Sequence, residues 1–346
     1  MASSMNKFLT IVIPTYNREK QLIRLLKSIE RQNAIDSYYI VILDNHSDYD
    51  VEASLKEQFS GYFFENIQFY HRPYNAGGDY NIGSSFLFAK SQYLWIIGDD
   101  DEVVDGCIDA IENNISRYPD MPLFKYQIKG NARYKEDIVI KNIEDFNYQY
   151  KRGYFIAGDV IFMSNNIFNL PALGEYISTA LYYSYCSIPH AIPMLRCMAD
   201  ERPFLWSHHE IIKYNAPEGD HWNFLKIATS FSTILDINIP GKYNVTQDFF
   251  KIISNHFEIW EFLYECLKIK DKGYRKYVVN KGLLSLFEKK SLTDILYYIF
   301  YKIEILSKVP FLSNIIKTKK KIDKYKDSLR DSNSLIYRMY KKIRRR

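Results

Sequence analysis

Residues 8–18 read FLTIVIPTYNR, a short apolar run that is rich in β-branched residues and ends in a polar turn. Such a run predicts a buried strand. The segment that follows, residues 18–32, places apolar side chains on one face of a helix: Leu22, Leu25, Leu26 and Ile29. Together the two segments predict a strand, a turn and a helix that packs back onto the strand.

The same alternation of strand and helix occurs three more times in the first third of the chain. Strands are predicted at residues 38–43 (YYIVIL), 67–71 and 93–97 (YLWII). Helices are predicted at residues 51–59, 80–89 and 108–115. Short apolar strands joined by helical crossovers form parallel sheets with helices on both faces. We therefore expect an α/β domain, in which ligands bind beyond the carboxyl ends of the strands.

Polar or acidic residues follow all four predicted strands. In chain order they are Thr15–Arg18, Asp44 with Asn45, Arg72 with Asn75–Gly78, and Asp99–Asp101. Because the carboxyl ends of parallel strands meet at one edge of a sheet, we expect these groups to lie close together. The sequence therefore predicts a ligand-binding edge built from four separate segments.

Three adjacent carboxylates, Asp99, Asp100 and Asp101, repel one another unless something neutralises them. One interpretation is a solvated turn or a helix N-cap. The other is a divalent cation held by carboxylate oxygens, with a phosphorylated substrate supplying the remaining ligands. The position after a buried parallel strand favours the cation. The chain has no Walker loop and no GxGxxG after the first strand, which argues against a P-loop NTPase and a dinucleotide-binding domain.

The whole chain has 346 residues, of which 47% are hydrophobic and 16% aromatic, and a net charge of +5. This composition excludes a disordered chain and a small disulfide scaffold. The four cysteines form no CxxC pair, so we expect a reducing, cytoplasmic environment and no cysteine-based zinc site. We expect neither a signal peptide nor a spanning helix, because residues 1–7 are polar and charges interrupt the apolar stretch at residues 295–316.

The second half of the chain is less regular. Residues 123–128 predict a strand, residues 131–153 predict a charged, Tyr-rich loop, and a helix is expected through Met194 and Leu195. From residue 222 onward, helical patterns occur at residues 224–235, 249–267, 274–287 and 292–306. We therefore expect an α-helical C-terminal region after the α/β domain.

The last thirty residues, 317–346, form a basic tail with 13 Lys and Arg against 3 Asp, so residues 1–316 carry a net charge of −5. This tail fits a solvated helix, a helix that joins two copies of the chain in a homodimer, or attachment to an anionic membrane surface. Near such a surface each basic residue contributes roughly 1 kcal/mol. No nucleic-acid-binding motif accompanies the tail, so we favour the membrane surface and expect no nucleic-acid partner.

Four ordered blocks resemble those of the family 2 glycosyltransferases. They are TIVIPTYNR at residues 10–18, Asp44 with Ser47 and Asp48, NAGGDYN at residues 75–81, and YLWIIGDDD at residues 93–101. The residues in these blocks are similar to those of bacterial transferases that decorate surface polysaccharides, the abequosyltransferase-like enzymes. The resemblance is strong over residues 8–116 and loose over residues 117–215.

The resemblance implies the GT-A fold, a Rossmann-like and mostly parallel sheet with helices on both faces. It implies a transferase domain at residues 1–221, followed by a helical domain at residues 222–316 and the basic tail. The donor half of the transferase domain would be residues 8–116, and the acceptor half residues 117–221.

The activity implied by this resemblance is a metal-dependent, inverting transfer of a sugar of the hexose type. The donor would be a nucleotide sugar, with a UDP-sugar favoured. The acceptor would be a hydroxyl group of a bacterial surface glycan such as capsule or O-antigen, free or lipid-linked. Such an enzyme would act in the cytoplasm or at the inner face of the cell membrane.

The resemblance also assigns roles to individual residues. The donor pocket would contain Pro14, Thr15, Tyr16, Asn17, Arg18, Asp44, Asn75, Gly77, Gly78 and Asp100. Tyr16 would lie against the base, and Asp44 would bind the base edge or the ribose. The chain departs from the family at Asn45 and His46, where Asp and Gly are usual, and this departure concerns the choice of nucleotide.

A divalent cation, Mn²⁺ or Mg²⁺, is implied by the DXD pattern of Asp99 and Asp101, with Asp101 as the direct ligand. His221 lies where some relatives place a histidine on the metal or diphosphate. Glycines at positions 77 and 78 would let the backbone approach the nucleotide closely, which a Cβ would block.

An inverting transfer needs a general base that takes the proton of the acceptor hydroxyl. The family supplies it from a Glu-Asp pair at the start of a helix, and in this register the chain has Pro189-His190. His190 can do this chemistry because the pKa of histidine lies near working pH. A structural histidine is the alternative at this position, and Asp220 is the second candidate for the base.

Two other functions compete with the transferase. A nucleotidyltransferase also uses paired carboxylates and Mg²⁺, but it usually needs a Gly-, Arg- or Lys-rich loop after the first strand, and residues 15–18 read TYNR. A non-catalytic scaffold that binds a nucleotide or a membrane would tolerate Asp101→Ala.

Overall fold

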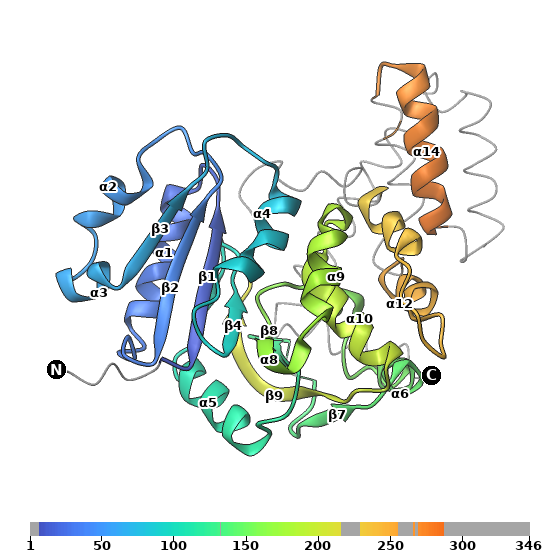
Figure 1. Cartoon of the computed structure of the whole chain (residues 1–346), viewed down its shortest axis with the longest axis horizontal. Helices are drawn as coiled ribbons and strands as arrows, with labels where there is room; N and C mark the ends of the chain where they lie inside the picture. Colours follow the sequence, from blue (N-terminus) through green and yellow to red (C-terminus); the bar gives the residue numbers. More distant parts are fainter. Residues whose placement is uncertain (1–6, 132, 216–228, 255–265, 267–268, 287–346) are drawn as a thin grey trace, which may run out of the picture.

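The computed structural model describes residues 7–131, 133–215, 229–254, 266 and 269–286. Figure 1 shows an α/β body in which the first strands stand side by side and a group of helices lies beside them. Within the described ranges, no helix is both long and apolar enough to cross a membrane. The predictions for residues 292–306 and for the basic tail lie outside these ranges.

The first third of the chain alternates strands and helices as the sequence predicts. Its elements are β1 (Leu9–Thr15), α1 (Glu19–Glu30), β2 (Tyr38–Asp44), α2 (Val51–Lys56), α3 (Gly61–Glu65), β3 (Ile67–His71), α4 (Gly78–Ser84), the 3₁₀ helix η1 (Ser85–Phe88), β4 (Tyr93–Ile96), β5 (Glu102–Val103) and α5 (Cys107–Arg117). The predicted helix at residues 51–59 is divided, because Ser60 caps a new helix, α3, by accepting a hydrogen bond from the Phe63 N–H group at 3.4 Å.

The four predicted strands form a parallel sheet in the order β3-β2-β1-β4. Thr15 pairs with Asp44, and Asp44 pairs with His71, so the last residues of three strands lie in one row. Val12 pairs with Ile96, which places the residues after β4 beside the same row. The register thus gathers the polar strand ends at one edge, as predicted.

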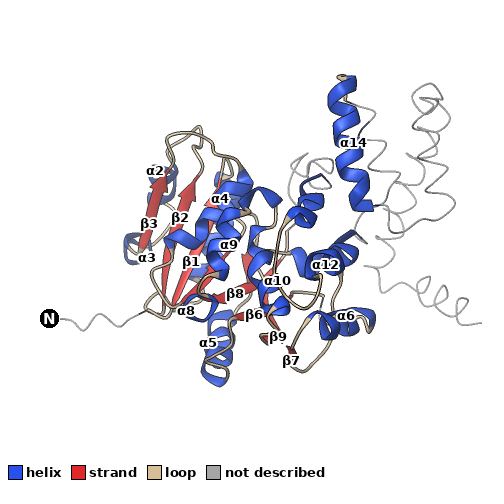
Figure 2. Ribbon diagram, turned by 45° about the vertical axis from the view of Figure 1, so that its right-hand side comes forward, coloured by secondary structure: helices blue, strands red, loops and turns tan. Residues whose placement is uncertain are grey.

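The second third of the chain extends this sheet. Its elements are β6 (Leu123–Ile128), β7 (Ile138–Ile140), α6 (Ile143–Lys151), α7 (Ala157–Ile161), β8 (Asn166–Asn169), α8 (Leu170–Leu173), α9 (Tyr176–Tyr182), the 3₁₀ helices η2 (Ser184–Cys186) and η3 (Pro189–Ala191), α10 (Ile192–Ala199) and β9 (Phe204–Lys213). Beyond β4 the sheet continues as β8-β6-β9-β5, and β7 pairs with β9 (Figure 2). Strand β8 is antiparallel to both of its neighbours, so this part of the sheet is mixed.

The prediction of a loop over residues 131–153 is wrong, because the segment contains β7 and α6. Strand β7 has only three residues, which is too short for alternation to be read from the sequence. Helix α6 buries Ile143 and Phe146, and Asn142 caps it by accepting a hydrogen bond from the Asp145 N–H group at 3.0 Å. The numerous charged and tyrosine residues of this segment conceal both signals.

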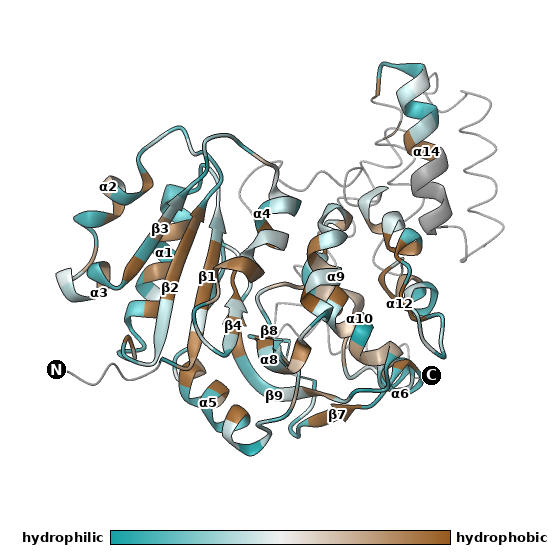
Figure 3. Ribbon diagram, viewed as in Figure 1, coloured by the Kyte–Doolittle hydropathy of each residue, from teal (hydrophilic) through white to brown (hydrophobic). Residues whose placement is uncertain are grey.

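Hydrophobic clusters cover both faces of the sheet. Alternate residues of one strand point to opposite faces: Val12 joins one cluster, and its neighbours Ile11 and Ile13 join the other. Helices α1 and α5 cover the second face, while α9 and α10 pack on the first. Figure 3 shows the brown, apolar strands β1 and β2 between elements with teal, polar outer surfaces. The predicted helices on both faces are therefore confirmed.

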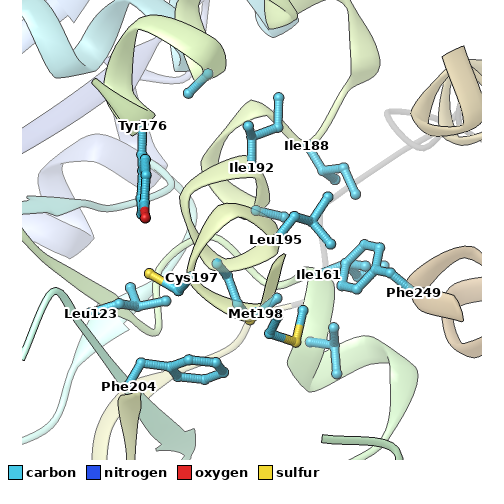
Figure 4. Packing of buried hydrophobic residues seen from close by; sticks show 14 of the residues in the cluster. Leu123, Ile161, Tyr176, Ile188, Ile192, Leu195, Cys197, Met198, Phe204 and Phe249 are labelled. Carbon is cyan, nitrogen blue, oxygen red and sulfur yellow. The ribbon is translucent and has the colours of Figure 1, made fainter. Parts of the chain in front are cut away.

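The C-terminal elements that the structure describes are helical, as predicted. They are the 3₁₀ helix η4 (Thr233–Asp236), α12 (Val245–Ser254) and α14 (Lys272–Leu286). Phe249 of α12 packs into the same cluster as Leu195 and Met198 of α10 (Figure 4). Its ring centre also lies 6.5 Å from that of Phe146 in α6. The first turns of the helical region thus share a core with the sheet.

Candidate functional site

The carboxyl edge of β1–β4 holds a network of buried acidic groups. Thr15 Oγ1 donates a hydrogen bond to Asp99 Oδ2 at 2.8 Å. Arg18 Nη1 donates to Asp99 Oδ1 and to Asp100 Oδ2, both at 2.8 Å. Arg24 Nη2 donates to the main-chain oxygen of Asp100 at 2.6 Å. Arg18 is therefore the internal counter-ion for two of the three carboxylates, and both oxygens of Asp99 have partners.

Asp101 differs from Asp99 in its hydrogen bonding. Ser164 Oγ donates to Asp101 Oδ2 at 2.6 Å, whereas Asp101 Oδ1 is buried and has no hydrogen-bond partner among the described residues. The side chain is only 2% exposed. Burial is the main cause that raises the pKa of Asp101 to about 8; the charges of Asp100 and Asp99 also raise it, whereas the Ser164 hydroxyl and the nearby main-chain N–H group of Asn215 lower it. A buried carboxylate with a free oxygen is the usual partner of a proton or a cation.

The pKa of Asp99 is also raised, to about 6. Burial is the main cause, and the neighbouring Asp100 charge adds to it, while Arg18 and Thr15 act in the opposite direction. Asp99 thus has its charge stabilised from inside the protein. Among the residues that the structure describes, Asp101 has no such internal cation, so of these two carboxylates it is the one whose negative charge is less well compensated.

The loops after β1 and β2 are tied together by Asn17. Its Nδ2 donates to Asp48 Oδ2 at 2.7 Å, and its Oδ1 accepts from the Asp48 N–H group at 2.8 Å. Its own N–H group donates to Ser47 Oγ at 3.0 Å. Asn17 adopts φ +52, a left-handed conformation that Asn tolerates better than most residues. The side chain of Asn17 therefore sets the shape of the loop that the sequence assigns to the donor pocket.

Asp44 is buried, and each of its oxygens has a partner. Oδ1 accepts from the Ser47 N–H group at 2.9 Å, and Oδ2 lies 3.1 Å from His71 Nδ1. His46 adopts φ +71, in the left-handed region that favours glycine, which explains why Gly is the usual residue at this position. Asp44 thus fixes a tight turn and still has lone pairs that face the edge.

The loop after β3 is held by two asparagines. Asn45 Nδ2 donates to Asn75 Oδ1 at 2.8 Å, and the same oxygen accepts from the Gly77 N–H group at 2.9 Å. Gly77 has φ +89, and a Cβ at either Gly77 or Gly78 would meet no atom within 4 Å. Asn45, which departs from the family pattern, therefore has a structural role here. Open space lies over both glycines.

The other residues predicted for the donor pocket lie at the same edge. Pro14 pairs with Leu43 inside the sheet, one residue before the edge. Tyr16 is 41% exposed, as expected of a ring that is free to stack on a flat ligand. The guanidinium carbon of Arg72 lies 5.0 Å from the centre of the Tyr80 ring, in a cation–π contact.

His190 lies in the core rather than at the edge. It is 3% exposed, and its Nε2 lies 2.8 Å from the main-chain oxygen of Ile161. Its Nδ1 has no hydrogen-bond partner among the described residues. Burial lowers the pKa of His190 to about 4. The environment is that of a packed histidine, and an acceptor hydroxyl could reach Nδ1 only if neighbouring side chains moved.

Asp220 and His221 lie outside the described residues. Asn215 is the last described residue before them, and it contacts the acidic edge. Its Nδ2 donates to the main-chain oxygen of Asp100 at 3.2 Å and to Glu102 Oε1 at 3.1 Å. Within the described ranges, no group of three or more His, Cys, Asp or Glu side chains could hold a metal ion. A cation at this edge would therefore need ligands from a substrate or from another segment.

Ser164 is the functional candidate that sequence analysis misses. It lies 63 positions after Asp101, in no block of the recognised pattern, and precedes β8. A serine before two asparagines carries no local signal that could connect it to Asp101. Only the antiparallel pairing of β8 with β4 brings this segment to the acidic edge.

The family model for glycosyl transferase family 2 matches residues 10–170. This range contains the four parallel strands, their polar ends and Ser164. The four blocks lie within this range, so the resemblance to the family 2 glycosyltransferases that they indicate is confirmed.

Curated relatives match about a third of the chain. The abequosyltransferase RfbV of Salmonella typhimurium is 30% identical over 116 residues, which are 33% of this chain and 34% of that protein. The GalNAc(5)-diNAcBac-PP-undecaprenol beta-1,3-glucosyltransferase of Campylobacter jejuni is 28% identical over 111 residues, 30% of this chain and 33% of that protein. The chain thus matches about a third of the length of these relatives.

A solved structure supports the fold over most of the chain. The structure of S. aureus TarS 1-349 in complex with UDP aligns with a TM-score of 0.54 and 12% sequence identity. The alignment covers 90% of this chain and 92% of that one. At this identity the likeness concerns the fold alone, and it confirms the predicted GT-A architecture.

Proposed function

We propose that this protein is a metal-dependent, inverting glycosyltransferase that uses a nucleotide-sugar donor. The observation that carries the proposal is the unpartnered, buried oxygen of Asp101 at the carboxyl edge of a family 2 domain. A UDP-sugar is the favoured donor, which is in line with the UDP bound in the TarS structure. The acceptor is a hydroxyl group of a bacterial surface glycan, in line with the names of the curated relatives.

The donor lies along the loops that follow β1, β2 and β3. Tyr16 stacks on the base, and the lone pairs that Asp44 has left accept from the base edge or the ribose. The main chain at Gly77 and Gly78 approaches the phosphates, since no side chain fills the space above it. Asn17 and Asn75 hold these loops in place through the bonds described above.

Asp101 Oδ1 would hold a divalent cation together with oxygens of the diphosphate of the donor. Carboxylate and phosphate oxygens are the ligands that Mg²⁺ and Mn²⁺ prefer. When bound, the ion stabilises the charge of the leaving diphosphate, a contribution of several kcal/mol in general. Arg18 engages Asp99 and Asp100, which leaves Asp101 as the ligand. His221 is a further proposed ligand, because Asn215, six positions before it in the sequence, contacts the acidic edge.

The general base is Asp220 or His190. The burial of His190 favours Asp220, which follows Asn215 by five positions and so belongs to a segment that starts at the acidic edge. Replacement of the true base by Asn or Ala should lower the rate of transfer by about 10²- to 10⁴-fold and leave donor binding unchanged. We would measure the rate of transfer and donor binding for Asp220→Asn and for His190→Ala. The variant that loses the rate but keeps donor binding identifies the base.

The basic tail, residues 317–346, lies outside the described residues, and we propose that it attaches the enzyme to the anionic inner face of the cell membrane. The support is its net charge of +10 with interspersed apolar residues. Co-sedimentation of the full chain with anionic and with neutral vesicles tests this. Binding to anionic vesicles that is lost at high salt is expected, and equal binding to both would contradict it.

Thermal shift with a panel of nucleotide sugars, with and without Mn²⁺, tests the main proposal. We expect one nucleoside diphosphate sugar to raise the melting temperature only when Mn²⁺ is present, and Asp101→Ala to abolish the shift. Asp50→Ala is the matched control, since Asp50 only caps α2 by accepting from the Ala53 N–H group at 2.9 Å. A metal-independent shift, or none with any donor, would contradict the proposal.

A further inference from the structure

The two oxygens of the Asp101 carboxylate have different surroundings. Oδ2 accepts a short hydrogen bond of 2.6 Å from Ser164 Oγ, and Oδ1 has no partner among the described residues. At Asp99, by contrast, Thr15 and Arg18 occupy both oxygens. Of these two carboxylates, only Asp101 is therefore held by one oxygen and open at the other.

The direction of the Ser164 hydroxyl proton is fixed by a second bond. The Gly98 N–H group donates to Ser164 Oγ at 2.9 Å, so this oxygen acts as acceptor toward β4. A serine hydroxyl has one proton, and in the ionised form of Asp101 that a cation requires, the carboxylate oxygen can only accept. Ser164 therefore donates to Asp101. Because Ser164 is only 1% exposed, its hydroxyl cannot donate to solvent instead.

The main chain around Ser164 is anchored independently of the acidic edge. Trp95 Nε1 in β4 donates to the main-chain oxygen of Ser164 at 2.7 Å. The next residue, Asn165, donates from Nδ2 to the main-chain oxygen of Tyr126 at 3.1 Å. Lys125 Nζ in turn donates to Asn165 Oδ1 at 3.0 Å and to Asn166 Oδ1 at 2.8 Å. The scaffold thus sets the position of the hydroxyl before any ligand arrives.

Gly98 provides the space for this arrangement. A Cβ at position 98 would lie 3.2 Å from Asp101 Oδ2 and 3.5 Å from Ser164 Oγ. Asp100 Oδ1 would also lie 3.2 Å away, and a contact of 3.2 Å is tighter than nine in ten such contacts, so a side chain here would require the two carboxylates to shift. The absence of a side chain at Gly98 and the hydroxyl of Ser164 therefore act on the same oxygen of Asp101.

We propose that Ser164 is a positioning residue whose hydroxyl holds Asp101 Oδ2 and so presents Oδ1 to a divalent cation bound with a nucleoside diphosphate. This inference rests on the proposed function, because it assigns the cation to Asp101. Without the serine, the carboxylate can rotate about its last bond, and the single orientation that suits the cation is lost. Partners of metal ligands typically change metal affinity by about 10- to 100-fold when they are removed.

The experiment is a titration of Mn²⁺ into the UDP-saturated full-length protein by isothermal calorimetry. It compares wild type with Asp101→Ala, Ser164→Ala, Ser164→Thr and Ser207→Ala. Ser207 is the matched control, because its buried hydroxyl donates to the Asp137 carboxylate at 2.9 Å and accepts from Asn114 Nδ2 at 2.8 Å. We expect Ser164→Ala to weaken Mn²⁺ binding by about 10- to 100-fold. Ser164→Thr keeps the hydroxyl and should restore most of the affinity, and Ser207→Ala should bind as wild type.

The outcomes separate the two proposals. If wild type binds Mn²⁺, Asp101→Ala does not, and Ser164→Ala binds as wild type, the role of Ser164 is overturned while the proposed function stands. If Ser164→Ala and Ser207→Ala weaken binding equally, the loss is one of stability, and the positioning role is again overturned. If wild type itself binds no Mn²⁺ in the presence of UDP, the metal dependence fails, and with it the role of Ser164.

Discussion

Two buried polar clusters lie on either side of residues 164–166, and they differ in how fully their polar atoms are bonded. In the lysine cluster, Lys125 Nζ donates to Val160 O at 3.4 Å and to the side-chain oxygens of Asn165 and Asn166 at 3.0 and 2.8 Å. It also lies 5.2 Å from the centre of the Trp206 ring. The amino group of Lys125 thus has three oxygen partners inside the protein.

The acidic cluster is formed by Thr15, Arg18, Asp99–Asp101 and Ser164. Among its described atoms, one buried oxygen has no hydrogen-bond partner. Asp101 Oδ1 is as deeply buried as Lys125 Nζ but has no partner among the described residues. A buried polar group that is saturated, with hydrogen-bond partners for all its atoms, stabilises one conformation and needs no ligand. An unsaturated one at the ligand-binding edge of an α/β sheet requires a ligand to complete it. The comparison predicts that the first cluster controls stability and the second controls activity.

Asp101→Asn should have the largest effect on activity. The change keeps the shape of the side chain but removes the charge that a cation needs. A loss of several kcal/mol of metal assistance corresponds to about 10³-fold in kcat/KM. The variant should also be at least as stable as wild type without metal, because a buried carboxylate with a raised pKa has been removed. Steady-state kinetics and urea unfolding measure the two effects, and a variant with more than a tenth of the wild-type kcat/KM would contradict the assignment.

Thr15→Val should have an intermediate effect. The substitution is close in shape and removes the hydroxyl that donates to Asp99 Oδ2. Asp99 then keeps only its contact with Arg18, and we expect kcat/KM to fall by about tenfold with a loss of about 1–3 kcal/mol in stability.

Thr10→Val is the control for Thr15→Val, because it removes a hydroxyl from the opposite end of the same strand. Thr10 Oγ1 lies 2.8 Å from Ser91 Oγ and accepts from the N–H groups of Lys90 and Ser91 at 2.9 and 3.0 Å. This variant should lose stability and retain activity. Equal losses of activity in both variants would remove the distinction between the edge and the rest of the sheet.

Lys125→Met should have the smallest effect on activity, within about twofold when assayed well below its melting temperature. Its effect is on stability and on how stability depends on pH. Burial lowers the pKa of Lys125 from 10.5 to about 7. Between these values the unfolded chain binds a proton that the folded protein has released, so the contribution of Lys125 to stability rises with pH.

The variant lacks this rise and leaves the side-chain oxygens of Asn165 and Asn166 without their donor. We therefore expect Lys125→Met to lower the free energy of unfolding by about 2 kcal/mol at a pH of about 9.5, and by less at a pH of about 7. Urea unfolding of both proteins at the two pH values measures this difference. An identical difference at both values would show that Lys125 stays protonated in the folded protein over this range, which would contradict the lowered pKa.

The strands β1–β4 and the edge at their ends could be predicted from sequence, because hydrophobic periodicity and strand-end polarity are local signals. The resemblance to the DXD pattern assigns the cation to Asp101, but the strand and helix patterns do not distinguish the three carboxylates. The side chain of Arg18, assigned to the nucleoside pocket, bridges Asp99 and Asp100, and a pattern does not show where a long side chain points.

The surroundings of two further residues could not be predicted from sequence, for the same physical reason. Ser164 reaches Asp101 only through the strand order β4-β8, a long-range pairing without a sequence signature. His190 occupies the position that the family register gives to the base, yet it is packed against Ile161 in the core. Burial depends on which helix covers a position, and this was not visible in the chain around residue 190.

The most direct test of the account is a crystal structure with Mn²⁺ and UDP, in which the anomalous signal locates the ion. The account predicts a peak at about 2.1 Å from Asp101 Oδ1, with Ser164 still bonded to Oδ2 and Arg18 still bridging Asp99 and Asp100. A peak bound to Asp99 with Arg18 displaced, or a diphosphate bound at this edge without any ion, would contradict the claim that Asp101 is the open ligand.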